Sequence, residues 1–229
     1  MLTPTTKFLK FHSQFITSLT RSLSTSLAAQ SHVPALMGFP NIVSPSLSHT
    51  MRNWFLSRAL ITPYFDAEFS QKEFDKGAHQ AAVIVANCIA EGDLDSLRSL
   101  VTSEAIKEIG INLSAYSPEE RRLLAVSEDD IYFSFAHQIG IMMDDHPTIE
   151  NASTKHVEIM WVGHSFPNYV DVVAEHKNPL DVKKHMDAKG GPMVLNYRFI
   201  KEFTIDTEDA WQINALNHFY INNPNYDYD

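Results

Sequence analysis

The first 65 residues of this 229-residue chain contain no aspartate or glutamate, and Asp66 is the first acidic residue. All 28 acidic residues therefore follow that point, together with 13 of the 18 basic residues, so residues 66–229 carry a formal net charge of −15. The acid-free part contains five lysines and arginines and many serines and threonines. This asymmetry is typical of a mitochondrial presequence that precedes an acidic mature domain.

Several features of enzymes and membrane proteins are missing from the sequence. The single cysteine, Cys88, excludes an internal disulfide and a zinc site made of cysteines. The sequence has no run of 18 apolar residues, the length that a helix needs in order to span a membrane. It also has no glycine-rich phosphate loop, HExxH or GxSxG motif. The acidic charge disfavours direct contact with nucleic acid, because phosphates would be repelled. We therefore predict no cofactor, no metal and no nucleic-acid partner.

The leader has the pattern of an amphipathic helix. Its cations Lys7, Lys10 and Arg21 lie roughly opposite an apolar side, so the helix could rest on an anionic surface with its charges outward. We expect residues 1–23 to form a presequence; the alternative is a disordered tail without a targeting role. The apolar side recurs at steps of three and four and consists of Phe8, Phe11, Phe15, Leu19 and Leu23.

Composition divides the rest of the chain into a linker, one domain and a tail. Residues 24–49 are rich in serine, alanine and proline and are expected to be a linker. Residues 50–222 are long enough for one domain with its own core, since 44% of the chain is hydrophobic and 11% is aromatic. Residues 223–229 are expected to form a flexible tail.

The first half of the domain is predicted to be helical. Residues 50–64 are expected to form a short helix, which either packs on the domain or touches a membrane; it carries Trp54, Phe55 and Arg58. A longer helix is expected between the cap Ser70, with Glu73 completing a capping box, and Gly92. A second helix is predicted from Asp93 to Glu108 and a third, short one from Ser117.

From residue 131 onward the pattern changes to an alternation of period two. Odd positions from Ile131 to Met143 are apolar or aromatic apart from His137, which predicts one long half-buried strand. Helices followed by a meander of strands predict an α+β fold, with helices on one face of a curved antiparallel sheet of about four strands. The other strands are expected at 154–165, 193–203 and 211–220, with an irregular segment at 166–192 that has only weak strand signals.

A curved sheet covered by helices would leave a conical pocket, and His137 is its best candidate for chemistry. It could act as a general base, but a core histidine bonded to a carbonyl is the simpler interpretation. Asp144, Asp145 and His146 are better explained by a solvated turn than by a metal site. Cys88 lies on the apolar side of its helix, where we expect a buried, inert thiol rather than a nucleophile.

Residues 60–106 contain the pairs Phe69-Ser70, Glu73-Phe74 and Gly77-Ala78 after Tyr64-Phe65-Asp66. With these residues the segment resembles the opening of the m-AAA protease-interacting protein family of the mitochondrial matrix. In that family a YFD..FS..EF..GA.QA stretch precedes a D.L..LV helix, and this chain follows both patterns. Residues 196–220 resemble the family's closing hairpin, with an EFT turn and Trp211 opening the last strand. The resemblance covers about 55–220 and is poor at 166–192. The matching residues are Tyr64, Phe65, Asp66, Phe69, Ser70, Glu73, Phe74, Gly77, Ala78, Gln80 and Ala81, followed by Asp95, Leu97, Leu100 and Val101.

The resemblance implies a cone-shaped domain of the nuclear-transport-factor-2 type. The same domain type is found in the anchor of the TIM import motor and in the inner-membrane ribosome receptor of mitochondria. It implies a non-enzymatic matrix protein, peripheral to the inner membrane, that binds m-AAA protease subunits as an adaptor or chaperone. Such a protein would assist the sorting, maturation or insertion of inner-membrane precursor proteins, including the small regulator of the calcium uniporter.

Two surfaces are candidates for partner contact. One is the N-terminal helix with Trp54, Phe55 and Arg58, and the other is the mouth of the cone. The mouth would be lined by Phe133, Phe135, Tyr197 and Phe199 around His137, although these aromatics are also expected simply to form core. Two other functions stay open: a factor that binds the mitochondrial ribosome at the inner membrane, and a small-molecule enzyme or ligand binder that uses the pocket around His137.

Overall fold

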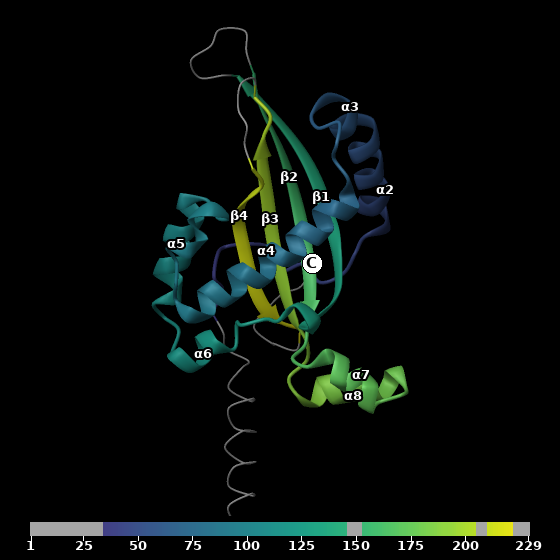
Figure 1. The fold of residues 1–229 in the computed structure, drawn as a ribbon, viewed down its shortest axis with the longest axis vertical. Coiled ribbons are helices and arrows are strands. Elements are labelled where there is room, and N and C mark those ends of the chain that lie inside the picture. The colour runs from purple at the N-terminus through teal and green to yellow at the C-terminus, as the bar shows by residue number, and fades with distance from the viewer. Residues whose placement is uncertain (1–33, 146–152, 205–209, 222–229) are drawn as a thin grey trace, which may run out of the picture.

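Four long strands form one antiparallel sheet in the order β1-β2-β3-β4 (Figure 1). The computed structural model describes residues 34–145, 153–204 and 210–221, so the predicted presequence and the predicted tail lie outside the described residues. Helices precede the sheet and pack against it, which confirms the predicted α+β class. The strands are β1 (Ile131–Asp145), β2 (Ser153–Ser165), β3 (Met193–Glu202) and β4 (Gln212–Tyr220).

Helix α4 (Gln71–Glu91) crosses one face of the sheet, in front of the strands in Figure 1. The Ser70 hydroxyl accepts a hydrogen bond from the Glu73 amide at its start, and Gly92 ends it with a positive φ of 78°. Both ends were predicted from the sequence, but the capping box is incomplete because the structure gives no return bond from the Glu73 side chain to the Ser70 amide. The apolar side of α4 packs on the largest core cluster, which includes Trp161 and Tyr197 from β2 and β3. Burial of this side, rather than helix propensity, holds the helix in place.

The segment that was predicted as one helix from Asp93 to Glu108 is instead broken in two. A 3-10 turn, η3 (Ser96–Ser99), is followed by α5 (Ser103–Leu113). Between them the backbone pairs with β4: the Ile213 amide donates to the Leu100 carbonyl at 2.7 Å, and the Thr102 amide donates to the Ile213 carbonyl at 2.9 Å. These bonds to another strand replace the intrahelical ones, so the helix cannot continue.

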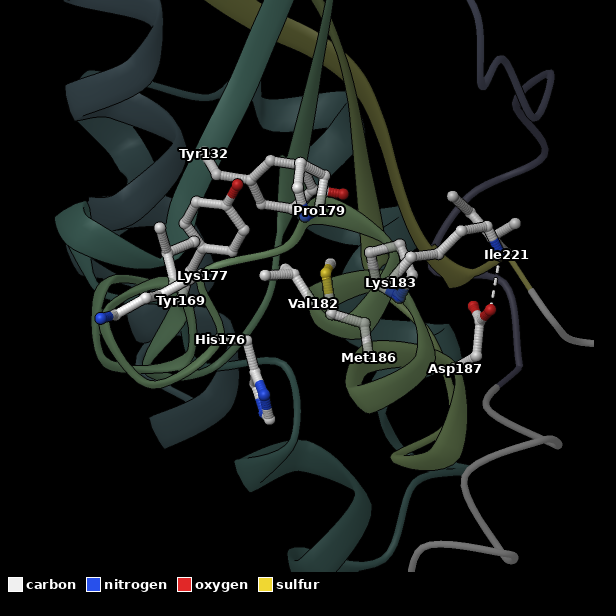
Figure 2. Close-up of a pocket in the computed structure, with 12 residues that line it drawn as sticks. Tyr132, Tyr169, His176, Lys177, Pro179, Val182, Lys183, Met186, Asp187 and Ile221 are labelled. Atoms are coloured by element: carbon white, nitrogen blue, oxygen red, sulfur yellow. Dashed lines mark hydrogen bonds and ion pairs between the residues drawn. The ribbon is translucent and has the colours of Figure 1, made fainter.

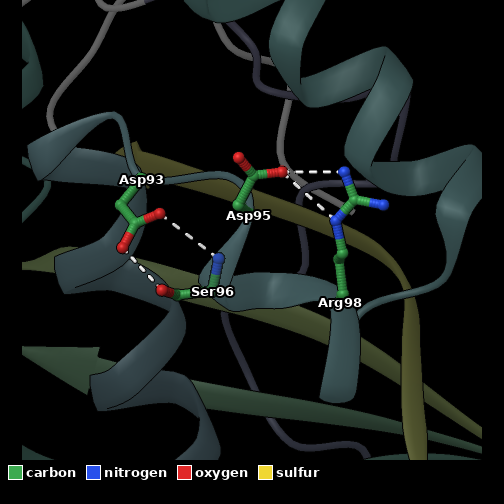
Figure 3. A network of polar contacts seen from close by, with 4 residues as sticks. All are labelled: Asp93, Asp95, Ser96 and Arg98. Carbon is green, nitrogen blue, oxygen red and sulfur yellow. Dashed lines mark hydrogen bonds and ion pairs between the residues drawn. The ribbon is translucent and has the colours of Figure 1, made fainter.

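Side chains stabilise the turn before this break (Figure 3). Asp93 accepts hydrogen bonds from the Ser96 amide at 3.2 Å and from its hydroxyl at 2.6 Å, which also lowers the pKa of Asp93. Arg98 pairs with Asp95 at 2.7 Å. Asp93 therefore stabilises the turn that leads into η3, while the helix that was predicted to begin at Asp93 starts only at Ser103. The short helix α6 (Pro118–Arg122) follows, with a complete capping box between Ser117 and Glu120.

The N-terminal helix begins earlier than predicted and runs beside β1 (Figure 1). It consists of α2 (Leu47–Leu56), one π-helical turn η2 (Ser57–Ile61) and α3 (Thr62–Tyr64). Ile61 is buried against Ile139 and Ile159, which fixes the end of this helix on the sheet. The predicted helix over 50–64 is thereby confirmed, with three more residues at its start.

Residues 34–46, which were expected to belong to a linker, wrap around the sheet. Leu36 and Met37 are buried in the core cluster on the helix side, and Ile42 and Val43 lie against the face opposite α4. Trp161 faces α4, and its neighbour Val162 therefore faces the other way, where Ile42 covers it. Side chains of the sheet hold this segment: His164 Nε2 donates to the Val43 carbonyl at 2.8 Å, and Asn196 donates to the Pro40 carbonyl at 2.9 Å. We call residues 34–46 the strap. It covers the second face of the sheet.

A bulge in β1 changes which side chains face the helices. The β1–β2 register shifts between Ala136 and Gln138, so His137 has no partner in β2. Before the bulge the odd residue Phe135 packs on the strap side, and after it the odd residue Ile139 packs on the helix side. The prediction that all odd positions of this strand share one face is therefore wrong, because one extra residue reverses the alternation.

The segment 166–192 is helical rather than irregular with strand signals. It forms α7 (Tyr169–Glu175) and α8 (Pro179–Ala188), which lie at the end of the sheet below β2 and β3 in Figure 1. Asn178 caps α8 by accepting a hydrogen bond from the Leu180 amide, and Pro179 occupies the first helical position. The prolines and glycines that predicted irregular structure are in fact the boundaries of two short helices.

We predict that Asn53→Ala lowers the free energy of unfolding by about 3 kcal/mol, because it leaves buried backbone groups of the β1 bulge without partners. The Asn53 amide donates to the carbonyls of Ala136 and His137, both at 3.0 Å, and its oxygen accepts from the Ile139 amide at 2.9 Å. Urea unfolding measures the loss. The matched control Asn112→Ala removes one bond, to the Leu36 carbonyl, and should cost only about 1 kcal/mol.

We also predict that stability falls as the pH decreases below about 6.5. Burial lowers the pKa of His137, His164 and His218, the last to about 3. The unfolded chain therefore takes up protons near pH 6.5 that the folded chain does not bind. Each such histidine contributes a slope of up to ~1.4 kcal/mol per pH unit until the pH reaches its folded pKa.

A single substitution isolates the contribution of His218, whose Nε2 lies 2.8 Å from the Tyr197 hydroxyl. His218→Gln removes the titration, so the slope of stability against pH should become shallower by roughly 1.4 kcal/mol per unit between pH 6 and pH 4. Asp75, whose burial raises its pKa to about 6, acts in the opposite direction and is the same in both proteins. Equal slopes in urea titrations would contradict a neutral, buried His218.

Candidate interaction surfaces

A groove opens between α4 and the start of β4, and many of the residues that carry the family resemblance line it. Its volume is about 360 Å³. We call it the aromatic groove. The segment 64–81 contributes Asp66, Phe69, Ser70, Glu73, Phe74, Gly77, Ala78 and Ala81, while Leu100, Phe199, Trp211 and Ile213 come from later in the chain. Residues that are far apart in the sequence thus meet in one concave surface.

Aromatic rings form the walls of this groove. Phe74 is central: its ring centroid lies 5.1 Å from that of Trp211, 5.3 Å from that of Phe199 and 6.3 Å from that of Phe69. Phe74, Gly77 and Ala81 face the groove together because their spacing of three and four places them on one side of α4. Since Phe69, Phe74 and Trp211 are only partly buried, the groove offers apolar surface to a partner.

The rim of the aromatic groove is acidic. Asp66, Glu68 and Glu73 line it, and the other described residues of the lining include no lysine, arginine or histidine. Asp66 is paired with Lys201 at 3.4 Å, whereas Glu68 and Glu73 are exposed and have no ion-pair partner among the described residues. The opening therefore favours cationic over anionic ligands.

A second apolar surface lies on the outer side of α2. Trp54 and Phe55 are 66% and 57% exposed, and Leu47 and Met51 continue the same side at helical spacing. Arg52 and Arg58 are exposed beside them, and residues 34–65 contain no acidic side chain. We call these six residues the α2 face. The three residues predicted as an interaction surface, Trp54, Phe55 and Arg58, thus lie together on solvent-exposed helix.

The residues predicted to line a conical pocket are not brought together. Tyr197 and Phe199 are buried in the core on the helix side of the sheet. Phe135 packs with the strap cluster, and Phe133 is 44% exposed beside it at a ring distance of 5.5 Å. His137 lies near Phe135 and 3.1 Å from His49 of α2. Among these predicted residues, Phe199 lines the aromatic groove and the others do not.

Comparisons with known proteins support the resemblance read from the sequence. Over 191 residues the chain is 28% identical to m-AAA protease-interacting protein 1, mitochondrial, of Rattus norvegicus, covering 80% of this chain and 60% of that protein. The proteins of the same name from Homo sapiens and Mus musculus are 28% and 27% identical, over 86% and 82% of this chain and 66% and 71% of theirs. This chain is a homologue of m-AAA protease-interacting protein 1.

The chain spans less than two thirds of the length of the rat relative that it matches. No family model matches it. The names of these relatives assign them to mitochondria, which agrees with the presequence predicted for this chain. The described helices include none that is long and apolar enough to cross a membrane.

A further cavity lies between α7, α8 and the end of the sheet (Figure 2). The family resemblance is poor in this part of the chain, so it did not predict the cavity. Its volume is about 520 Å³. The rings of Tyr132 and Tyr169 stack at 4.3 Å on one side, and Val182 and Met186 of α8 close another. The spacing of Val182 and Met186 after Asn178-Pro179 is a helical signal, but the surrounding prolines and glycines obscured it.

Within the described ranges no group of three histidine, cysteine or acidic side chains could hold a metal ion. His176 and His185 lie 3.2 Å apart without a third ligand. Burial, followed by the charges of Asp93 and Glu91, raises the pKa of the Cys88 thiol. The raised pKa favours the protonated thiol near neutral pH, but Cys88 is only partly buried and not fully buried as predicted. Asp144 and Asp145 are the last two residues of β1, and His146 lies outside the described residues.

Proposed function

We propose that this chain is a non-enzymatic mitochondrial adaptor that binds the m-AAA protease. The observation that carries the proposal is the aromatic groove, an open apolar surface made by the residues that resemble the family. Partly exposed aromatic side chains in a concave surface are typical of protein-binding sites. The relatives' name states that they interact with this protease, and the groove gives this chain a surface with which to do so.

In this proposal the adaptor works on newly imported inner-membrane proteins. It would bind precursor segments or present them to the protease, and so assist their sorting, maturation or insertion. The small regulator of the calcium uniporter belongs to this class of client. The resemblance supports this role, and two separate apolar surfaces on one small domain suit a protein that joins two partners.

The α2 face supports a position at the matrix side of the inner membrane. A helix with exposed aromatics and flanking arginines can lie on an anionic bilayer with its apolar side in the interface. The rest of the domain is strongly acidic and would be repelled by the same lipids, so contact would be limited to this face. Peripheral attachment of this kind needs no membrane-spanning helix.

Affinity purification of the tagged full chain from mitochondria in mild detergent tests the proposal directly. We expect m-AAA protease subunits among the recovered proteins, above the amount obtained with an unrelated matrix protein carrying the same tag. Mass spectrometry identifies the partners. Recovery of ribosomal proteins without protease subunits would contradict the proposal and support the ribosome-binding alternative. Recovery of neither would also contradict it.

Flotation with lipid vesicles tests the proposed membrane contact. Replacing Trp54 and Phe55 together by serine should weaken binding to vesicles that contain anionic lipid by about tenfold or more, because two interfacial aromatic anchors are lost. The matched control is Ile111→Ser on α5, where the side chain is 72% exposed but has no arginines beside it in sequence. Equal binding of both variants to the vesicles would contradict a specific role for the α2 face.

A further inference from the structure

Gly77 occupies a place in α4 where neither the backbone nor the packing requires glycine. It lies in the interior of the helix with an ordinary negative φ, where glycine is less favourable than alanine. A Cβ atom built on it would meet no heavy atom within 4 Å. Two other glycines at or in helices differ: Gly92 has a positive φ, and a Cβ on Gly110 would lie 3.1 Å from Leu94.

The space that a side chain at position 77 would enter is the aromatic groove. Gly77 lines the groove between Phe74 and Ala81, one helical turn from each. A larger side chain there would project between the walls formed by Phe69 and Trp211 and reduce the open volume. A glycine at position 77 is therefore useful only if a side chain of a bound partner fills the space that is left open. Glycine keeps the groove open at a cost in helix stability.

We propose that the aromatic groove receives an apolar side chain of a protein segment in which lysine or arginine flanks that anchor. This inference rests on the proposed function as a protein-binding adaptor and specifies the chemistry of the bound segment. The apolar anchor would pack over Gly77 against Phe74 and Trp211. The flanking cations would pair with Glu68 and Glu73, the two exposed carboxylates of the rim.

Charge decides between the possible occupants. An acidic segment or an anionic lipid would bring negative charge next to Glu68 and Glu73, in a domain that already carries excess negative charge. A purely apolar segment would leave both carboxylates unused. A cation beside the anchor gains from the rim and can also lie over the face of an aromatic ring in the wall. The groove thus matches a basic, apolar segment.

Binding of synthetic peptides to the full chain tests this inference independently of the protease. The probe is a fluorescently labelled peptide with a Lys-Leu-Phe-Lys centre between glycine and serine residues. Two comparison peptides replace the lysines by glutamates or the Leu-Phe pair by serines. Fluorescence anisotropy should show at least tenfold weaker binding of each comparison peptide, and the preference for lysine should decrease at high salt.

Variants at position 77 separate folding from binding. Gly77→Ala should raise the midpoint of thermal unfolding by about 1–4 °C, since alanine is the better helix former and nothing obstructs its Cβ. Gly77→Leu should fold at least as stably as the native chain but bind the lysine-flanked probe at least tenfold more weakly. The matched control Gln80→Leu adds the same side chain to an exposed site of α4 outside the groove lining and should bind like the native chain.

The inference is overturned if Gly77→Leu binds the probe as tightly as the native chain does, or if the glutamate-flanked peptide binds equally well. It is also overturned if the native chain binds none of the peptides. Purification of partners with the Gly77→Leu variant distinguishes failure of the groove inference from failure of the proposed function. If Gly77→Leu loses peptide binding but still recovers m-AAA subunits, the groove chemistry is supported and the protease contact lies elsewhere. If the native chain recovers the protease but binds no peptide, only the groove inference is refuted.

Discussion

The position of helix α2 depends on one buried side chain, that of Asn53. β1 is an edge strand, and at its bulge three backbone groups have no complete set of partners within the sheet. Asn53 supplies two donors and one acceptor to them and is itself almost fully buried. Because Asn53 points inward, Trp54 and Phe55 must point outward. A requirement of the fold thus creates the exposed apolar face that we assign to membrane contact.

The two faces of the sheet are covered by different means. Helices cover one face with a continuous apolar core around Trp161 and Tyr197. The strap covers the other with few apolar residues and several hydrogen bonds from buried polar side chains, among them Asn196 and Asn217. An extended segment cannot bury much apolar area, so its backbone groups need these partners in order to lie against a sheet.

The aromatic groove stays open because of two local features, a break in a predicted helix and a glycine in α4. The helix predicted to continue past Leu97 is interrupted where the backbone pairs with Ile213, and this pairing places Leu100 at one side of the groove. On the other side, α4 has glycine at position 77 where alanine would stabilise the helix. The glycine lowers local helix stability at the surface that we propose to bind a partner, which is the usual relation between stability and function.

Local signals in the sequence were enough to predict the four strands, both ends of α4 and the start of α6. Ser70, Gly92 and Ser117 act through groups within four residues of themselves, so their roles follow from short-range chemistry. The sequence also singled out Trp54, Phe55 and Arg58 as a candidate surface, although it left open whether their helix packs on the domain or touches a membrane. The set of residues that resemble the family likewise needed no structure to be recognised.

Only the tertiary structure decided how these parts combine. The bulge at His137, the break after Leu100 and the packing of the strap all arise from bonds between segments far apart in the chain, which periodicity cannot report. Phe135 packs on the strap side, with Phe133 beside it. Tyr197 and Phe199 are buried on the helix side, so the expected conical pocket is not formed from these residues. The aromatic groove instead joins Phe74, Phe199 and Trp211, because strand register and helix crossing, rather than sequence spacing, set which side chains meet.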